Sequence, residues 1–213
     1  MPPGKGLCRA ALLLAALAAT AAAAAEDPNA ITYGITPLAG YRFGGHFDDS
    51  GSGESLRLDS RAAFALALDA ATDPGRAYEV LYARQATRFQ GAGFAGIDTH
   101  VEYLHLGGRL DLSDAAPPWL PYLAGGLGVT RIAPSGVNAR EDEHFSLSLA
   151  LGVRLALTEH LRARLEGRGY ATFIGSQSSL FCRSDESGAL CQIRAQGSTL
   201  VQGELLAGLA FEF

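Results

Sequence analysis

His144 and Ser146 have the residue types needed for nucleophilic catalysis. A histidine can take the proton of a serine hydroxyl, provided that a third group orients the histidine. In a strand the two side chains would share a face, because residues two apart point the same way. No glutamate is well placed to orient His144, since Glu159 belongs to a turn at the other end of the segment. We therefore assign no catalytic residue and interpret the pair as a loop-edge histidine beside a serine that faces inward.

Charged side chains alternate with apolar or small ones in LRARLEGRGYATF, residues 161–173. Arg162, Arg164, Glu166 and Arg168 would share one face of a strand. If this strand belongs to a membrane barrel, an arginine on its lipid face would cost about 2 to 4 kcal/mol at the bilayer midplane. The row is therefore predicted to face the lumen of the barrel. Charges held out of bulk water need partners, which predicts a structural network. Its other predicted members are Arg154, Gln202, Glu204, His100 and Glu102.

The strands that would carry these residues are indicated by period-two alternation. In FSLSLALGVRLAL, residues 145–157, every second position from Phe145 to Leu157 is apolar. A strand of this length, tilted near 45°, spans roughly 30 Å, more than an apolar band about 25 Å tall. Similar segments predict seven more strands, over residues 33–43, 56–69, 78–85, 99–112, 119–132, 161–173 and 199–213.

Two of these segments are harder to orient. In 99–112 the pattern favours Thr99, Val101 and Tyr103 on the lipid side, with His100 and Glu102 toward the lumen. Segment 119–132 has no decisive face, and its glycines at 125, 126 and 128 indicate close packing or sharp coiling. A soluble sandwich or lipocalin-like barrel would also show alternation, but it would bury an apolar interior. The Arg, Glu and Gln residues at mid-strand favour a membrane barrel instead.

The connecting segments alternate in length. Residues 70–75, 113–118 and 158–160 are short turns. The segments 44–55, 89–96, 133–143 and 175–197 are longer. An even-stranded barrel with both termini in the periplasm has short periplasmic turns and long outer loops. Together the segments predict an all-β fold, an eight-stranded antiparallel transmembrane β-barrel.

Residues 1–25 are predicted to be a secretory signal peptide for the Sec pathway. Lys5 and Arg9 precede an Ala- and Leu-rich run, and three alanines stand before Glu26. The barrel domain would then cover 26–213. The whole chain has a formal charge of −5, and the predicted signal contains two basic residues and no acidic one. An acidic chain has no broad electrostatic surface for nucleic acid.

Cys182 and Cys191 are the cysteines that remain after the predicted signal, in FCRSDESGALC. In an exported chain two such cysteines are expected to form a disulfide. The alternative is a metal site with two thiolates, but no histidine lies near and such a site suits a reducing compartment better. We expect no metal and no cofactor.

The last segment carries the clearest resemblance to a known family. Phe213, Phe211, Leu209 and Leu205 share one face, and the segment ends on an aromatic residue. This pattern resembles the closing strand of small bacterial outer-membrane β-barrels, the group that includes the OmpA transmembrane domain, OmpX, OmpW and the opacity proteins. The resemblance implies an outer-membrane location, delivery by periplasmic chaperones and recognition of Phe211 and Phe213 by the barrel-assembly machinery. It also implies contact with outer-membrane lipid and lipopolysaccharide.

Three functions follow as hypotheses. The first is a non-enzymatic envelope protein, with a structural role or an adhesive role through its extracellular loops, because eight strands enclose a lumen that side chains fill. The second is a narrow channel for small hydrophobic solutes, as the resemblance to OmpW implies. The third is a lipid A modifying enzyme, since His144 and Ser146 are similar to the pair in lipid A deacylase barrels. That family continues with Asn where this chain has Leu147, and its catalytic set faces lipid.

Overall fold

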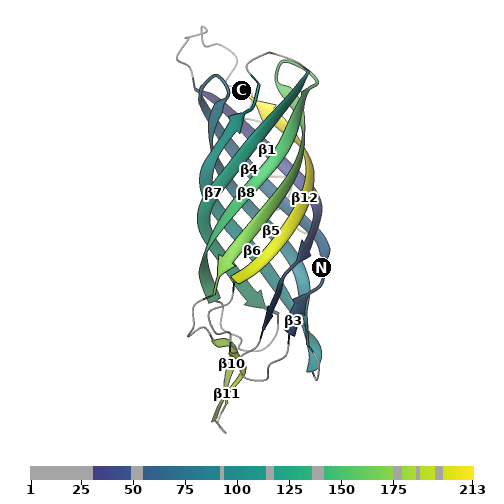
Figure 1. The fold of residues 1–213 in the computed structure, drawn as a ribbon, viewed down its shortest axis with the longest axis vertical. Helices are drawn as coiled ribbons and strands as arrows, with labels where there is room; N and C mark the ends of the chain where they lie inside the picture. The colour runs from purple at the N-terminus through teal and green to yellow at the C-terminus, as the bar shows by residue number, and fades with distance from the viewer. Residues whose placement is uncertain are drawn as a thin grey trace, which may run out of the picture.

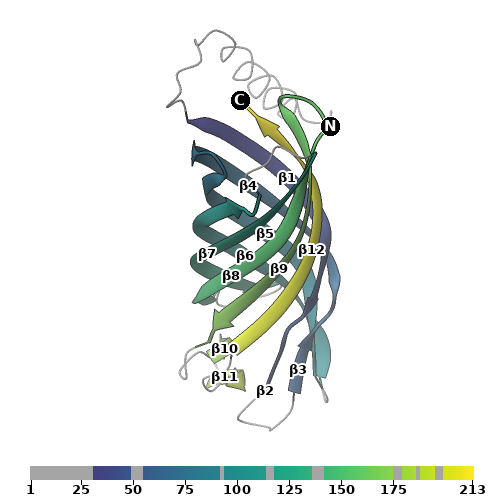
Figure 2. The same cartoon turned by 45° about the horizontal axis from the view of Figure 1, so that its top comes forward.

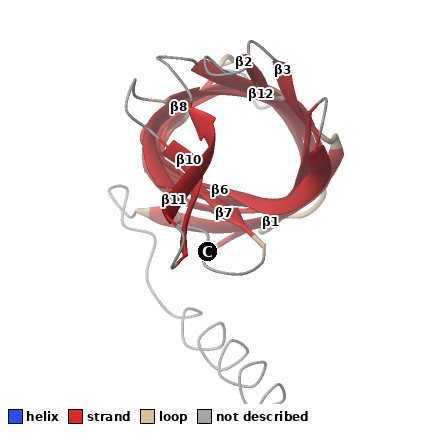
Figure 3. Cartoon of the chain, turned by 90° about the horizontal axis from the view of Figure 1, so that it is seen from below, coloured by secondary structure: helices blue, strands red, loops and turns tan. Residues whose placement is uncertain are grey.

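The computed structural model describes residues 31–48, 55–91, 94–113, 118–135, 142–174, 179–185, 188–194 and 199–213. Regular structure within these ranges is all β-strand (Figure 3). None of the described residues belongs to a helix long and apolar enough to cross a membrane. Residues 1–25, predicted to be a signal peptide, lie outside the described ranges.

Eight long strands form the wall of a closed barrel (Figures 1 and 3). They are β1 (Thr32–Gly44), β4 (Arg61–Asp73), β5 (Arg76–Gly91), β6 (Phe94–Asp111), β7 (Trp119–Pro134), β8 (Asp142–Ala156), β9 (Leu161–Phe173) and β12 (Thr199–Glu212). Consecutive wall strands pair antiparallel, and β1 closes the ring against β12. The predicted eight-stranded antiparallel barrel is confirmed.

Four short strands extend from one end of this wall. β2 (His46–Asp48) pairs with β3 (Ser55–Leu58), and β3 pairs with the end of β5. β10 (Ser179–Asp185) and β11 (Gly188–Arg194) form a separate hairpin at the same end (Figure 1). We call this the loop end. The opposite end, where the chain terminates and the short turns lie, is the turn end (Figure 2).

The segment 89–96 was expected to be a long loop, and this expectation is wrong. β5 continues to Gly91 and β6 begins at Phe94, so both strands project past the wall. The reason is that the backbone here has pairing partners on both sides. Phe89 lies opposite Leu58 of β3 and Ile97 of β6, and its side chain is buried.

The outer surface of the wall is apolar, with an aromatic girdle near each end. Tyr33, Tyr78, Trp119, Phe211 and Phe213 are exposed near the turn end, and Tyr41, Phe43, Phe145 and Phe173 near the loop end. Leucines such as Leu149 and Leu165 are exposed between the girdles. This distribution is the one expected of a barrel whose outer surface faces lipid.

Segment 99–112 is oriented opposite to the prediction. Val101 and Tyr103 are buried inside the barrel, whereas His100 and Glu102 lie on the outer face. Glu102 lies opposite Arg84 of β5 and Arg131 of β7 and forms ion pairs with both, at 3.3 and 3.4 Å. These charges lie near the loop-end girdle, where water and headgroups can solvate them. At the rim of the barrel, therefore, the alternation of polar and apolar residues did not show which side of the strand faces the lumen.

In segment 56–69, residues 59 and 60 interrupt the strand, and Leu58 is buried while Phe64 is exposed. In β7 the predicted close packing is confirmed at Gly128, where a Cβ would overlap the carbonyl oxygen of Leu104 on β6.

The last residue seals the β1–β12 seam, which yields a prediction. The backbone N–H of Phe213 donates to the carbonyl of Tyr33 at 2.9 Å, and the N–H of Tyr33 donates to the carbonyl of Phe213 at 2.9 Å. Deleting Phe213 should remove both bonds and one girdle aromatic. We expect less heat-modifiable, folded protein in the membrane fraction. Phe173→Ala, which shortens a loop-end girdle residue without touching the seam, is the control. Wild-type levels after the deletion would contradict this.

The expected disulfide also gives a prediction. Cys182 and Cys191 are directly opposed in the β10–β11 hairpin. Opposed residues of antiparallel strands have Cβ atoms about 4.5 to 5.5 Å apart, close to the roughly 3.8 Å of a disulfide. We expect the unreduced, denatured protein to resist a thiol reagent and Cys182→Ser to label once. Full labelling of the unreduced wild type would rule the bond out.

Candidate functional site

A closed circuit of two arginines and two glutamates crosses the lumen near mid-barrel. Arg164 and Arg168 come from β9, as does Glu166, and Glu79 comes from β5 on the opposite wall. Arg164 donates to Glu79 at 2.6 Å and to Glu166 at 2.5 Å, while Arg168 donates to Glu79 at 2.7 Å and to Glu166 at 2.6 Å. All four side chains are at most 2% exposed. The circuit therefore balances two positive with two negative charges away from bulk water.

Polar side chains from other strands complete the hydrogen bonds of this circuit. The hydroxyl of Tyr122 donates to Glu166 at 2.6 Å and accepts from Arg164 at 2.8 Å. Arg168 also donates to Ser148 at 3.2 Å. Buried charges are tolerated when such additional bonds satisfy their remaining donors and acceptors. The mid-lumen is therefore filled by a connected polar network rather than by isolated ion pairs.

A layer of aromatic rings covers the circuit on its loop-end side. Tyr103 and Tyr170 stack with ring centroids 4.1 Å apart, and the guanidinium of Arg42 lies 4.8 and 5.1 Å from these centroids. Arg42 pairs with Glu204 at 3.1 Å, and Glu204 also accepts from the hydroxyl of Tyr170 at 2.7 Å. Stacked rings and a cation over their faces attract each other beyond simple burial. The layer therefore fills this level of the lumen with fully buried side chains.

The loop-end half of the lumen contains a cluster of buried apolar side chains. Leu58, Phe89, Ile132, Ile174 and Leu200 are all buried and belong to one cluster with the aromatic layer. They come from several walls of the barrel and its extension, so the cluster extends across the lumen. Water or ions would have to separate these side chains to pass.

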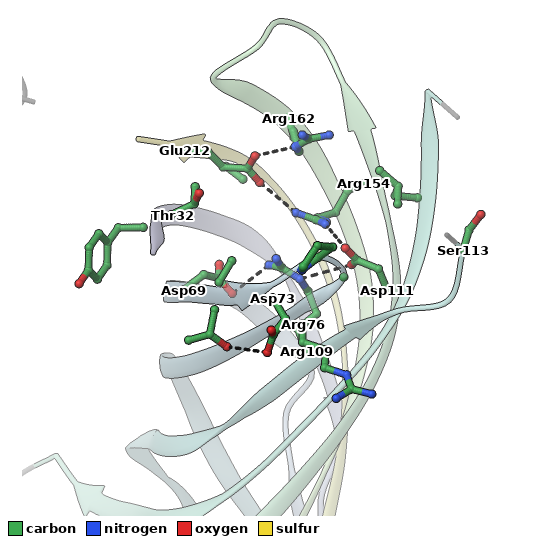
Figure 4. Close-up of a pocket in the computed structure, with 18 residues that line it drawn as sticks. Thr32, Asp69, Asp73, Arg76, Arg109, Asp111, Ser113, Arg154, Arg162 and Glu212 are labelled. Atoms are coloured by element: carbon green, nitrogen blue, oxygen red, sulfur yellow. Dashed lines mark hydrogen bonds and ion pairs between the residues drawn. The ribbon is translucent and has the colours of Figure 1, made fainter. Parts of the chain in front are cut away.

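The turn end instead opens into a charged pocket of about 610 Å³, which we call the vestibule (Figure 4). A chain of alternating charges lines it, from Asp69 through Arg109, Asp111, Arg154 and Glu212 to Arg162. The tightest contacts are Arg154 with Asp111 at 2.5 Å and Arg162 with Glu212 at 2.7 Å. Asp69 also lies 3.6 Å from Arg164, which links the vestibule to the circuit.

The residues predicted for the lumen network occupy three places. Arg164, Glu166 and Arg168 form the circuit, and Arg154 and Arg162 line the vestibule. Glu204 and Gln202 belong to the aromatic layer, where Gln202 accepts from the hydroxyl of Tyr103 at 2.7 Å. His100 and Glu102 are outside the barrel.

Sequence reasoning did not assign several members of the network. Arg42 and Glu79 alternate with outward residues in the way that Arg164 does, so the pattern contained a signal for them. Tyr103, by contrast, was predicted to face lipid. Tyr122 belongs to segment 119–132, for which the sequence indicates no decisive face, and it is fully buried. An aromatic residue suits a lipid girdle and a lumen equally well, so its type does not decide its side.

His144 and Ser146 both face the lumen, as residues two apart on one strand should. Ser146 is hydrogen-bonded to His105, whose ring nitrogens lie 2.8 Å from Ser146 and 2.8 Å from Ser148. His144 is buried at the loop end of β8, and the described residues provide no hydrogen-bond partner for its Nε2. Among those residues no group of three His, Cys, Asp or Glu side chains could hold a metal ion.

Comparison with known proteins agrees with this architecture. A family model described as "Outer membrane protein beta-barrel domain" matches residues 10–213. Comparison with curated proteins gives no match.

Solved structures show the same fold. The structure of Neisserial surface protein A is 17% identical with a TM-score of 0.54, over 85% of this chain and 97% of that one. Outer membrane protein AlkL is 13% identical with a TM-score of 0.52, over 90% of this chain and 94% of that one. The lipid-facing girdles, the closed eight-stranded wall and the family match over nearly the whole chain agree. This chain is a bacterial outer-membrane protein and belongs to the outer membrane protein β-barrel domain family.

Proposed function

We propose that this protein is a non-enzymatic, closed outer-membrane barrel with a structural or surface-contact role through the segments at its loop end. The observation that carries this proposal is the filled lumen. The circuit of Arg164, Arg168, Glu79 and Glu166 crosses the barrel, and the apolar cluster at the loop end covers it. A pathway for water or ions would have to break both layers.

We propose that the barrel has the orientation expected of this fold. With the short turns in the periplasm, the vestibule opens inward and the β10–β11 hairpin extends outward. The apolar cluster then seals the barrel on the outer side. In this arrangement the surface that outside partners meet is made of the loop-end segments, while the wall serves to hold them in the membrane.

The remaining partners are inferred from the requirements of the fold. We propose that lipopolysaccharide surrounds the loop-end girdle, where Arg84, Arg131 and other exposed cations lie. Delivery by periplasmic chaperones and insertion by the barrel-assembly machinery through Phe211 and Phe213 are proposed on the same basis. The exposed aromatic side chains of Phe211 and Phe213 are available for recognition before the seam closes.

A narrow channel for small hydrophobic solutes is the second candidate. The observation that favours it is that Leu58, Phe89, Ile132, Ile174 and Leu200 make the loop-end interior apolar, so a hydrophobic molecule could partition there. A lipid A modifying enzyme has less support. The hydroxyl of Ser146 faces the filled lumen rather than lipid, and mass spectrometry of lipid A with and without the protein would test this directly.

Removing one member of the circuit gives a stability prediction. Glu79→Gln leaves Arg164 and Arg168 with an uncompensated buried positive charge, which should cost about 3 to 5 kcal/mol of the free energy of unfolding. Glu102→Gln breaks ion pairs on the outer face and should cost less than about 1 kcal/mol. Urea unfolding in lipid vesicles measures both. Equal losses in the two variants would refute the assignment of Glu79 to a sealed interior.

Ion conductance distinguishes the proposed closed barrel from a channel. Wild-type protein in a planar bilayer should show no steady ion conductance. The double variant Glu79→Ala/Arg168→Ala keeps the charge balance but removes half of the circuit, so it should conduct more often. Glu102→Ala/Arg131→Ala removes a matched pair from the outer face and should stay silent. Clear, solute-dependent conductance of the wild type would reject the closed barrel and favour the channel.

A further inference from the structure

The outer face of the wall has a groove of about 590 Å³ where β5, β6, β7 and β8 meet near the turn end. Its floor is a pair of opposed glycines, Gly108 of β6 and Gly125 of β7. The next residues in the same row are Tyr78 on one side and Leu149 on the other. Both are strongly exposed, at 66% and 61%. In this row, therefore, β6 and β7 have no side chain in the space between the large apolar side chains of Tyr78 and Leu149.

The groove continues to the polar rim of the barrel. Thr72, Asp73 and Arg76, at the turn between β4 and β5, line its end at the rim. Asp73 and Arg76 are register partners and expose opposite charges to the same space. In Figure 4 the ion pairs join Arg109 to Asp69 and Asp111, whereas Arg76 is joined to none of the residues drawn. No other described residue forms an ion pair with Arg76.

We infer that this groove is a binding site for one zwitterionic phospholipid. An acyl chain would lie over Gly108 and Gly125 between Tyr78 and Leu149, and the headgroup would reach the rim. There the phosphate meets Arg76 and the ammonium meets Asp73. At this depth the surroundings of the barrel are lipid, so an acyl chain fills the groove without a cost of dehydration.

The glycine floor and the charged rim contribute to lipid binding in different ways. Lipid tails are as apolar as the wall, so the glycine floor attracts a chain through close contact rather than through the hydrophobic effect. The rim provides the discrimination, because charge-assisted bonds to a phosphate and an ammonium require both signs at the correct spacing. A second copy of the chain is the other occupant to consider, and the experiment below distinguishes it by the dimer that it would form.

Native mass spectrometry of the detergent-purified barrel, equilibrated with phosphatidylethanolamine, tests the chain site. Wild type should keep one lipid per barrel, and Gly125→Leu, which fills the groove, should lose this adduct. Gly169→Leu is the matched control, because Gly169 also faces outward and a Cβ there would meet only the carbonyl oxygen of Leu149, at 3.9 Å, but it does not line the groove. Retention of the lipid by Gly125→Leu overturns the site. So does a wild-type dimer that this variant converts to monomers with its lipid unchanged.

The headgroup contacts are tested by variants that leave the wall intact. Arg76→Gln should reduce the phosphatidylethanolamine adduct several-fold, whereas Arg84→Gln, an exposed arginine at the other end, should not. Phosphatidylglycerol lacks the ammonium and should bind less well, and Asp73→Asn should erase that preference. Equal retention of both lipids by the wild type, or no effect of Arg76→Gln, overturns the proposal. If Gly125→Leu fails to fold, as judged by heat-modifiable mobility, Arg76→Gln and Asp73→Asn still test the proposed lipid site.

Discussion

The pairing of Arg164 and Arg168 with Glu79 and Glu166 is the constraint on which the rest of the interior depends. An eight-stranded wall encloses a space that side chains just fill, so a charge placed there cannot rely on bulk water. Four charges from two opposite walls solve this problem by satisfying one another within 2.7 Å. The same contacts tie β5 to β9 across the barrel, which main-chain hydrogen bonds between neighbouring strands do not do.

The interior differs on the two sides of this circuit. Toward the turn end the charges continue as an alternating chain into an open vestibule, while toward the loop end they give way to stacked rings and then to aliphatic side chains. On our proposal, this gradient makes the barrel a blind pocket rather than a pore. It also separates two roles, since one end is an open polar vestibule and the other is an apolar base for the extended β2–β3 and β10–β11 segments.

Most of the wall could be predicted from the sequence because one side of each strand must suit lipid. Phe145 to Leu157 and the arginine row of β9 follow period two without interruption, and both lie as predicted. The prediction failed where that requirement weakens. His100 and Glu102 lie at the rim, where the outer face can be charged, and Tyr103 has a ring that suits either side. Residues 89–91 resembled a loop because the strand that pairs with them, β3, is short and preceded by a Gly- and Ser-rich stretch.

The site itself was predictable only in part. Alternation indicated that Arg164 and Arg168 face inward, but their partner Glu79 is more than eighty residues away and meets them only through the stagger of the strands around the barrel.

The most direct test of the sealed interior is a crystal structure in lipid at a resolution that shows ordered water. We predict water in the vestibule, Glu79 hydrogen-bonded to both Arg164 and Arg168, and a lumen without water from Tyr103 to Leu200. A continuous column of water from the vestibule to the loop end would contradict it.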